Sequence, residues 1–232
     1  MFWTFVEATP ALGGTVQIDG KRGHHLARVL RVRPGERGIA VFAGREYEVE
    51  VVAVEGARID ARVLSDRPAR GEPATAVRLF QAVLPNPDFD AVLEAGTAVG
   101  IQRFVAVQAA RSIGRPPAGR VRRWETIVES AAEQSHRGLI PTVTGPVTLS
   151  SALVDASDGR LLALDPSASL PLAQAIDGSA TYTIAVGPEG GWTDDERSLL
   201  GARGAVSVNL GPRILRARLA PIVAAAILVQ RP

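Results

Sequence analysis

The sequence predicts an α/β protein in two parts, a small β-rich segment followed by an open α/β sheet. The first 64 residues contain three runs of β-forming residues separated by turn residues, at 38–44, 47–55 and 57–65. Beyond residue 76, strand-like runs alternate with helical stretches, the order typical of a parallel sheet covered by helices. Between these patterns, residues 65–75 combine two prolines, a glycine and charges without periodicity, so we expect the domain boundary there.

The N-terminal part predicts a small, barrel-like β domain. The run at 47–55 alternates apolar residues with glutamates, as in a strand with one buried face. Residues 21–36 predict one short helix whose apolar face is formed by Leu26, Val29 and Leu30, and which ends at Pro34.

The C-terminal part predicts an open, mostly parallel sheet. The candidate strands are 77–83, 104–109, 161–165, 181–187 and 206–211. The last two lack interior charges, as expected of strands covered on both faces. Within 119–137, apolar residues from Val121 to Ala131 recur at helical spacing, which predicts an amphipathic helix.

Composition excludes several function classes. The chain has no cysteine, which removes disulfide scaffolds, thiolate metal sites and cysteine nucleophiles. Only three histidines are present, so we expect no metal site. The N-terminus lacks a basic head followed by a long apolar run. The apolar run 219–229 is about half the ~20 residues that a membrane span needs. We therefore expect a cytoplasmic protein with no membrane partner.

The basic residues are almost all arginine. Of the 26 lysines and arginines only Lys21 is a lysine, which leaves 25 arginines. Arginine binds phosphate in a bidentate way and stacks on bases, so this composition is compatible with nucleic acid binding. Coding bias explains it equally well, because the chain is also rich in alanine, glycine and valine.

The first candidate ligand loop lies in residues 183–200. A strand without charges ends at Gly187, a glycine-rich loop follows, and Thr193 and Glu196 form a capping box that begins a helix. Ligands of α/β sheets bind just beyond the carboxyl ends of strands. The loop does not match G-x-G-x-x-G, which argues against a nicotinamide-dependent oxidoreductase. A tight strand–helix connection without a ligand is the alternative.

The second candidate loop lies in residues 208–230. Another strand ends in a Gly-Pro turn, followed by Arg213, Arg216 and Arg218 and then by a helix that is apolar on all sides. Such a helix must be buried in the core or against another subunit. Pro221 suits its first turn. Arg218 beside this helix N-terminus is electrostatically unfavourable, which suggests an anionic partner, although a solvated arginine is the simpler reading.

Together the motifs HHLARVLRVRPGE (24–36), EQSHRGLIP (133–141), VGPEGGWTDDE (186–196) and LGPRILR (210–216) resemble the 16S rRNA (uracil-N3)-methyltransferase family. This family belongs to the SPOUT class of knotted methyltransferases. The resemblance implies a PUA-like RNA-binding β-barrel at 1–68 and a SPOUT-type α/β domain with a C-terminal trefoil knot at 74–232. It further implies a homodimer, S-adenosyl-L-methionine as cofactor, and ribosomal RNA of the small subunit, or the small ribosomal subunit itself, as partner.

The resemblance also assigns residues. Arg216 and Arg137 are implied as catalytic, stabilising the uracil anion that forms when nitrogen 3 loses its proton. The implied RNA-binding residues are His24, His25, Arg28, Arg31, Arg111 and Arg137. The implied cofactor-binding residues are Leu164, Gly187, Pro188, Glu189, Gly190, Gly191, Leu210, Gly211, Pro212, Ile214, Leu215 and Arg216.

Several positions depart from the family pattern, and two of them lose an acidic residue. Arg218 stands where the family has an acidic residue, and Ala98 also replaces an acidic residue. Two alternatives therefore stay open beside methyl transfer to a uridine. One is a SPOUT methyltransferase that acts on another RNA, and the other is an RNA-binding module with impaired catalysis.

Overall fold

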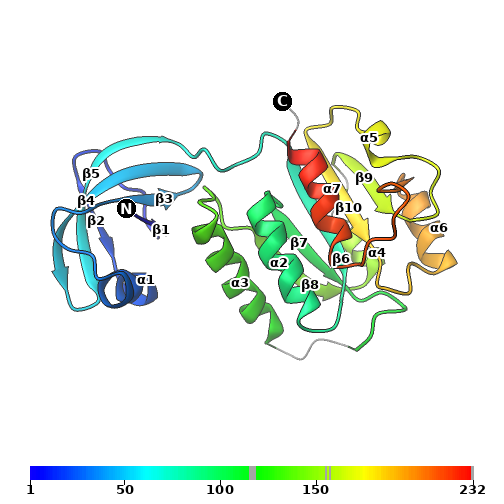
Figure 1. Ribbon diagram of the computed structural model, residues 1–232, viewed down its shortest axis with the longest axis horizontal. Coiled ribbons are helices and arrows are strands. Elements are labelled where there is room, and N and C mark those ends of the chain that lie inside the picture. The colour runs from blue at the N-terminus through cyan, green and yellow to red at the C-terminus, as the bar shows by residue number, and fades with distance from the viewer. Residues whose placement is uncertain (115–118, 155, 157, 231–232) are drawn as a thin grey trace. The chain divides into compact units, whose positions relative to one another are not determined.

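The computed structural model describes residues 1–114, 119–154, 156 and 158–230 (Figure 1). The chain forms two compact units. The first contains Met1–Glu72 and Ala132–Leu139, and the second contains Pro73–Ala131 and the chain from Ile140 onward. Each unit has its own hydrophobic core.

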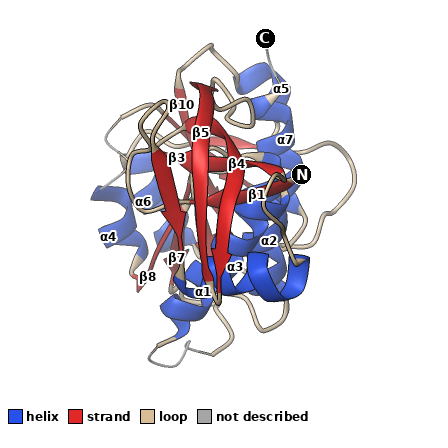
Figure 2. Ribbon diagram, turned by 90° about the vertical axis from the view of Figure 1, so that its left-hand side faces the viewer, coloured by secondary structure: helices blue, strands red, loops and turns tan. Residues whose placement is uncertain are grey.

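The first unit is built on a five-stranded sheet in the order β1-β3-β4-β5-β2. Its strands are β1 (Phe2–Phe5), β2 (Thr15–Ile18), β3 (Arg37–Phe42), β4 (Arg45–Glu55) and β5 (Arg58–Pro68). β1 pairs in parallel with β3 and the other neighbours are antiparallel, with β3, β4 and β5 side by side (Figure 2). The three predicted strands are confirmed, and the short β1 and β2 are additional.

The alternation predicted along β4 separates core from surface. Val49 and Val51 are buried, whereas Glu48 and Glu50, which alternate with them, lie on the other face. Strand β5 continues to Pro68, so the first residues of the expected linker at 65–75 belong to the sheet, because they pair with the start of β4.

The predicted helix at 21–36 is shorter and irregular. An α-helix, α1 (Gly20–His24), passes into a π-helix, η1 (His25–Leu30), which ends at Arg31 with a φ of 55°. Leu26 is buried as predicted, but Val29 and Leu30 are 62% and 51% exposed. The predicted apolar face is therefore wrong for these two residues, because the change from α to π winding turns them away from the core.

The second unit is an open six-stranded parallel sheet in the order β11-β9-β10-β6-β7-β8, which confirms the α/β class. Its strands are β6 (Ala76–Ala82), β7 (Arg103–Val107), β8 (Thr142–Val147), β9 (Arg160–Leu164), β10 (Thr181–Val186) and β11 (Val206–Val208). Sequence patterns missed β8, which contains Gly145 and Pro146. It is an edge strand, the place in a sheet where proline is tolerated.

Helices cover both faces of this sheet (Figure 1). They are α2 (Asp88–Val99), α3 (Arg120–Gln134), α4 (Leu149–Val154), α5 (Leu172–Ala175), α6 (Asp194–Ala202) and α7 (Ala220–Val229). One face packs against α2, α3 and α7, with Phe89, Trp124 and Leu228 in its core. The other packs against α4 and α6 through Leu153 and Leu200. The last turn of α3 belongs to the first unit.

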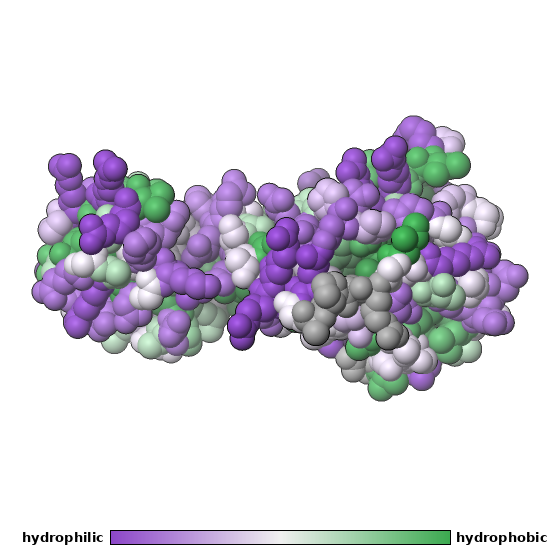
Figure 3. All heavy atoms as spheres, turned by 90° about the horizontal axis from the view of Figure 1, so that it is seen from below, coloured by the Kyte–Doolittle hydropathy of each residue, from purple (hydrophilic) through white to green (hydrophobic). Residues whose placement is uncertain are grey.

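The surface is mostly polar. In the space-filling view, hydrophilic residues cover much of the visible face and hydrophobic residues form scattered groups (Figure 3). No helix among the described residues is long and apolar enough to cross a membrane. Within the same residues, no three histidine, aspartate or glutamate side chains lie close enough together to hold a metal ion.

Candidate active site

The register of three neighbouring strands brings their carboxyl ends together. Leu164 at the end of β9 pairs with Val186 at the end of β10 and with Val208 at the end of β11. The loops that follow these three strands surround a cavity of about 290 Å³. This volume lies near the lower end of the range for small-molecule sites. The lining residues include Leu164, Asp165, Val186, Gly187, Pro188, Glu189, Gly191, Trp192, Arg197, Val208, Asn209, Leu210, Gly211, Arg213, Ile214, Leu215, Arg216, Ala217 and Ala220.

The glycine-rich loop after β10 is a rigid turn. Gly191 has a φ of 68°, a conformation that favours glycine, and its N–H donates to the Pro188 carbonyl at 2.8 Å. The predicted capping box is confirmed. The Glu196 N–H donates to the Thr193 hydroxyl at 3.3 Å, and the Thr193 N–H donates to the Glu196 carboxylate at 2.9 Å. The start of α6 therefore holds the end of this loop.

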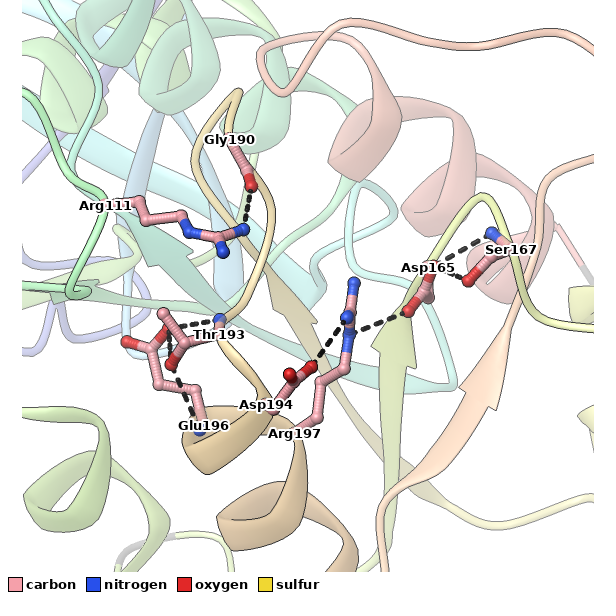
Figure 4. Close-up of polar contacts among 8 residues, drawn as sticks. All are labelled: Arg111, Asp165, Ser167, Gly190, Thr193, Asp194, Glu196 and Arg197. Carbon is pink, nitrogen blue, oxygen red and sulfur yellow. Dashed lines mark hydrogen bonds and ion pairs between the residues drawn. The ribbon is translucent and has the colours of Figure 1, made fainter.

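The same loop is tied to the segment after β7. Arg111 donates from Nη1 to the Gly190 carbonyl at 2.7 Å (Figure 4). The second carboxylate oxygen of Glu196 accepts from the Ala110 N–H at 2.8 Å. Two contacts from the segment after β7, two strands away from β10 in the sheet, thus fix the loop that forms one wall of the cavity.

The other wall is the loop after β11. Gly211 has a φ of 92°, and its N–H donates to the Asn209 side-chain oxygen at 2.9 Å. The amide nitrogen of Asn209 donates to the Ala168 carbonyl at 2.8 Å, which links this wall to the loop after β9. Ile214 is 86% exposed at the tip of the loop, so an apolar side chain stands in solvent beside the cavity.

A charged group borders the cavity on the β9 side. Arg197 from α6 lies 3.2 Å from the Asp165 carboxylate and 3.4 Å from Asp194 (Figure 4). The hydroxyl and the backbone N–H of Ser167 both donate to Asp165, at 2.7 and 2.8 Å. Burial raises the pKa of the Asp165 carboxyl, but the hydrogen bonds from Ser167 and the charge of Arg197 outweigh it and hold the pKa below its ordinary value. Asp165 is therefore a carboxylate at neutral pH.

Arg218 has an anionic partner within the chain. Its Nη1 lies 2.9 Å from Asp88, in the first turn of α2. This pair places a carboxylate near the N-terminus of α7 and offsets the unfavourable charge that the sequence predicted. Arg218, the departure from the family pattern, therefore forms an ion pair within the chain. Arg213 and Arg216, in contrast, are exposed and pair with no carboxylate in the part of the chain that the structure describes.

Most of the predicted cofactor residues border one cavity. Ten of the twelve line it, and Gly190 and Pro212 lie in the same two loops without lining it. Sequence patterns missed Asp165, Arg197 and Asn209. Asp165 is the last residue of the predicted strand at 161–165 and could have been found on that ground, whereas Arg197 reaches the cavity only through the packing of α6.

The predicted RNA-binding residues lie in different surroundings. His24, His25, Arg28 and Arg31 are all exposed on or just after the helical segment α1–η1 of the first unit. Arg111 is exposed in the second unit, where it holds the glycine-rich loop.

Arg137, predicted as both catalytic and RNA-binding, is buried in the first unit. It is 1% exposed and binds Glu72 through two hydrogen bonds of 2.8 and 2.7 Å. Its guanidinium is thus largely occupied by an ion pair within the unit, which favours a structural role.

Two family models match the chain. One, described as an RNA methyltransferase domain, matches residues 71–229, and the other, described as an RNA methyltransferase PUA domain, matches residues 18–64. With the parallel sheet and its cavity, these matches define the class as RNA methyltransferases that carry a PUA domain. The chain belongs to the ribosomal RNA small subunit methyltransferase E family.

Relatives and solved structures support this assignment. A ribosomal RNA small subunit methyltransferase E from Mycobacterium bovis is 37% identical, over 95% of this chain and 88% of the relative. The protein of the same name from Synechocystis is 33% identical, over 91% of this chain and 72% of the relative. A crystal structure of the Neisseria gonorrhoeae methyltransferase E bound to S-adenosyl methionine superposes with a TM-score of 0.89. It is 29% identical, with 97% of this chain and 96% of that chain covered.

Proposed function

We propose that this protein transfers a methyl group from S-adenosyl-L-methionine to ring nitrogen 3 of one uridine in the 16S RNA of the small ribosomal subunit. The observation that carries the proposal is the cavity between the GPEGG loop and the LGPRILR loop, in a chain of the methyltransferase E family. The relative from Neisseria gonorrhoeae, whose structure contains S-adenosyl methionine, supports the choice of cofactor.

The residues around the cavity fit this cofactor. Leu164, Val186 and Leu210 supply apolar surface of the kind that an adenine ring needs. The backbone of the two glycine-containing loops is accessible because Gly191 and Gly211 carry no side chain. Asp165 and Glu189 put carboxylates beside the cavity, where they can accept hydrogen bonds from ribose hydroxyls or an ammonium group and favour a positively charged sulfonium.

Arg216 is the residue to which we assign the anion-stabilising role. When bound, the cofactor supplies a methyl group activated by its positively charged sulfur. Nitrogen 3 of uracil must lose its proton before or during attack, and the negative charge is shared with the two carbonyl oxygens beside it. Arg216 borders the cavity and has no carboxylate partner among the described residues, so its guanidinium is available to those oxygens. Arg137, the other candidate, is buried against Glu72.

The pairing of the arginines indicates where RNA would bind. On the face of the first sheet that carries Glu46 and Glu48, arginines and glutamates neutralise each other. Arg67 lies 2.6 Å from Glu46 and Arg37 lies 3.2 Å from Glu48. By contrast Arg28 and Arg31 are exposed and make no such pair within the described residues. We therefore propose that the segment α1–η1, which also carries His24 and His25, contacts RNA phosphates.

The family resemblance carries finer features that we also propose. The sheet of the first unit would close into a PUA-like barrel, and the domains would span 1–68 and 74–232, apart from Ala132–Leu139, which belongs to the first unit. The loops after β10 and β11 would form a trefoil knot, which their facing positions across one cavity support. A homodimer would form through α7, where Leu219 and Ile227 are 48% and 36% exposed although the helix carries no charge.

The test is methyl transfer from labelled S-adenosylmethionine to small ribosomal subunits that lack the modification, mapped by reverse-transcription stops. We expect one stop, at a single uridine. Arg216→Ala should lower kcat by about 10²–10³-fold, the usual effect of removing one anion-stabilising donor. Arg203→Ala, an exposed arginine outside this cavity, is the matched control. Bound cofactor without incorporation, or methylation of another atom, would contradict the proposal.

A further inference from the structure

Two aromatic rings are stacked on the surface of the first unit. The Trp3 and His136 rings lie 4.5 Å apart between centroids and within 13° of parallel. Trp3 is partly buried on β1 and packs against the core residues Phe5, Ile39 and Ala132. This packing holds the indole in place beneath the His136 ring. His136 is exposed. One face of the imidazole is therefore occupied by Trp3, while the ring as a whole remains accessible to solvent.

The backbone holds His136 in an unusual conformation. Its φ is 56°, in the left-handed region that few residues other than glycine adopt. The segment around Gly71 lies against it. A Cβ at Gly71 would come within 2.3 Å of the His136 carbonyl oxygen, so only glycine allows this approach. Such strained positions, when the surroundings enforce them, are found mainly at binding and catalytic sites.

A cationic side chain lies next in sequence to the segment that packs against His136. Arg70 precedes Gly71, is exposed, and makes no ion pair among residues for which the structure gives a position. Its backbone N–H donates to Glu46 at 2.8 Å, which fixes the backbone from which the side chain extends. A flat ring and a cation close to the same turn are the two components that proteins use to hold a single-stranded nucleotide.

We propose that His136, supported by Trp3, is a stacking platform for one unpaired RNA base, and that Arg70 binds an adjoining phosphate. The proposal rests on the proposed function in that its ligand is RNA, but it adds a contact outside the segment α1–η1. An unpaired base is the ligand that fits, because every base presents a flat π-face, whereas paired bases do not expose theirs. Both Trp3 and His136 belong to the first unit, so the platform does not depend on the cofactor cavity.

The first experiment measures binding of the full-length protein to a fluorescein-labelled 15-nucleotide oligouridine by anisotropy. His136→Asn keeps a side chain that tolerates the left-handed conformation but removes the ring. We expect it to weaken binding at least about fivefold, the effect of losing roughly 1 kcal/mol of stacking on one base. His136→Phe, which keeps a ring on a more strained backbone, should bind more tightly than His136→Asn. Because stacking involves no ion release, the slope of log K against log salt should stay unchanged in His136→Asn and decrease in Arg70→Ala.

A second measurement begins with the wild-type protein. In the wild-type protein, an abasic site moved along an otherwise identical oligonucleotide of mixed sequence should weaken binding at one position. That position should lose its effect in His136→Asn. Trp124 is 1% exposed, and Trp192 is 2% exposed but lines the cofactor cavity, so quenching by RNA that remains in a Trp192→Phe variant would report Trp3.

The outcomes separate this proposal from the proposed function. The platform is refuted if His136→Asn binds the oligonucleotide as wild type does, if no abasic position matters, or if wild type does not bind it at all. Methylation of small subunits by the same preparation would leave the proposed function intact in each case. An Arg28→Ala, Arg31→Ala variant that loses RNA binding while His136→Asn keeps it would assign RNA contact to α1–η1 alone.

Discussion

Breaking the ion pair between Arg137 and Glu72 should destabilise the first unit. Arg137 is a buried cation whose side chain is 2% exposed, and Glu72 is 16% exposed. The Glu72 carboxylate also accepts from the backbone N–H groups of Gly138 and Leu139, at 2.9 and 3.1 Å. One carboxylate therefore neutralises a buried charge and satisfies the turn that follows α3.

Removing one member of this pair should be costly. Breaking a buried ion pair costs about 3–5 kcal/mol because the remaining charge stays desolvated. Since water reaches Glu72, we expect the lower end, about 3 kcal/mol, for Glu72→Gln and for Arg137→Met. At roughly 2 °C or more per kcal/mol, the melting temperature should fall by at least about 6 °C. The double variant should recover most of the loss, because glutamine still accepts from the backbone and no charge is left buried.

The assay is urea unfolding of the single and double variants, followed as a double-mutant cycle. Arg123→Met is the matched control, since Arg123 lies 2.7 Å from Asp90, the same distance as in the buried pair, but is 59% exposed. Its loss should cost about 0–1 kcal/mol. If Arg137→Met costs no more than Arg123→Met, the reasoning is wrong. If Arg137→Met leaves stability unchanged but abolishes methyl transfer, Arg137 acts on RNA.

Three further results are expected. Gly191→Ala should weaken S-adenosylmethionine binding, measured by calorimetry, by about 1–2 kcal/mol, because alanine is strained at a φ of 68°. The control is Gly201→Ala in α6, where a Cβ meets open space; this variant should bind the cofactor as wild type does. A hydrogen bond from the Ser179 hydroxyl, followed by others, lowers the pKa of Asp177 to about 2. The ionised Asp177 carboxylate therefore contributes to the stability of the folded protein. This contribution is complete above the ordinary pKa of Asp, near 4, and is lost as the pH falls towards 2. An NMR titration should show that midpoint, and Ser179→Ala should raise it; an unchanged midpoint would refute the role of Ser179. Light scattering should give a dimer for wild type and a monomer for Ile227→Glu, and a wild-type monomer at active concentrations would refute the dimer.

Short-range patterns in the sequence determined the class of fold and the cofactor loops. The uncharged strand β10, the capping box at Thr193 and Glu196, and the strand–loop–helix order all depend on residues a few positions apart. Hydrophobic periodicity and capping act over one or two turns of chain, so they can be recognised without knowing the tertiary structure. The same holds for the amphipathic helix α3, whose predicted face is buried around Trp124.

Contacts between distant residues required the tertiary structure. Arg218 finds Asp88 across 130 positions, and Arg137 finds Glu72 across 65. The sequence could suggest that each arginine has an anionic partner. It could not identify that partner, because opposite charges attract without regard to sequence separation. Arg137 therefore resembled a functional arginine until its burial was known.

Backbone geometry was equally hidden. The change from α to π winding at His25, which exposes Val29 and Leu30, leaves no periodic signal that differs from that of an α-helix. The stack of His136 on Trp3 joins a strand at the N-terminus to the turn after α3. Local propensity determines which segments become helix or strand, whereas the ladder register and the packing of one segment on another decide which side chains meet. The ladder register and the packing between segments, and not local propensity, form the cavity, the buried ion pair and the stacked rings.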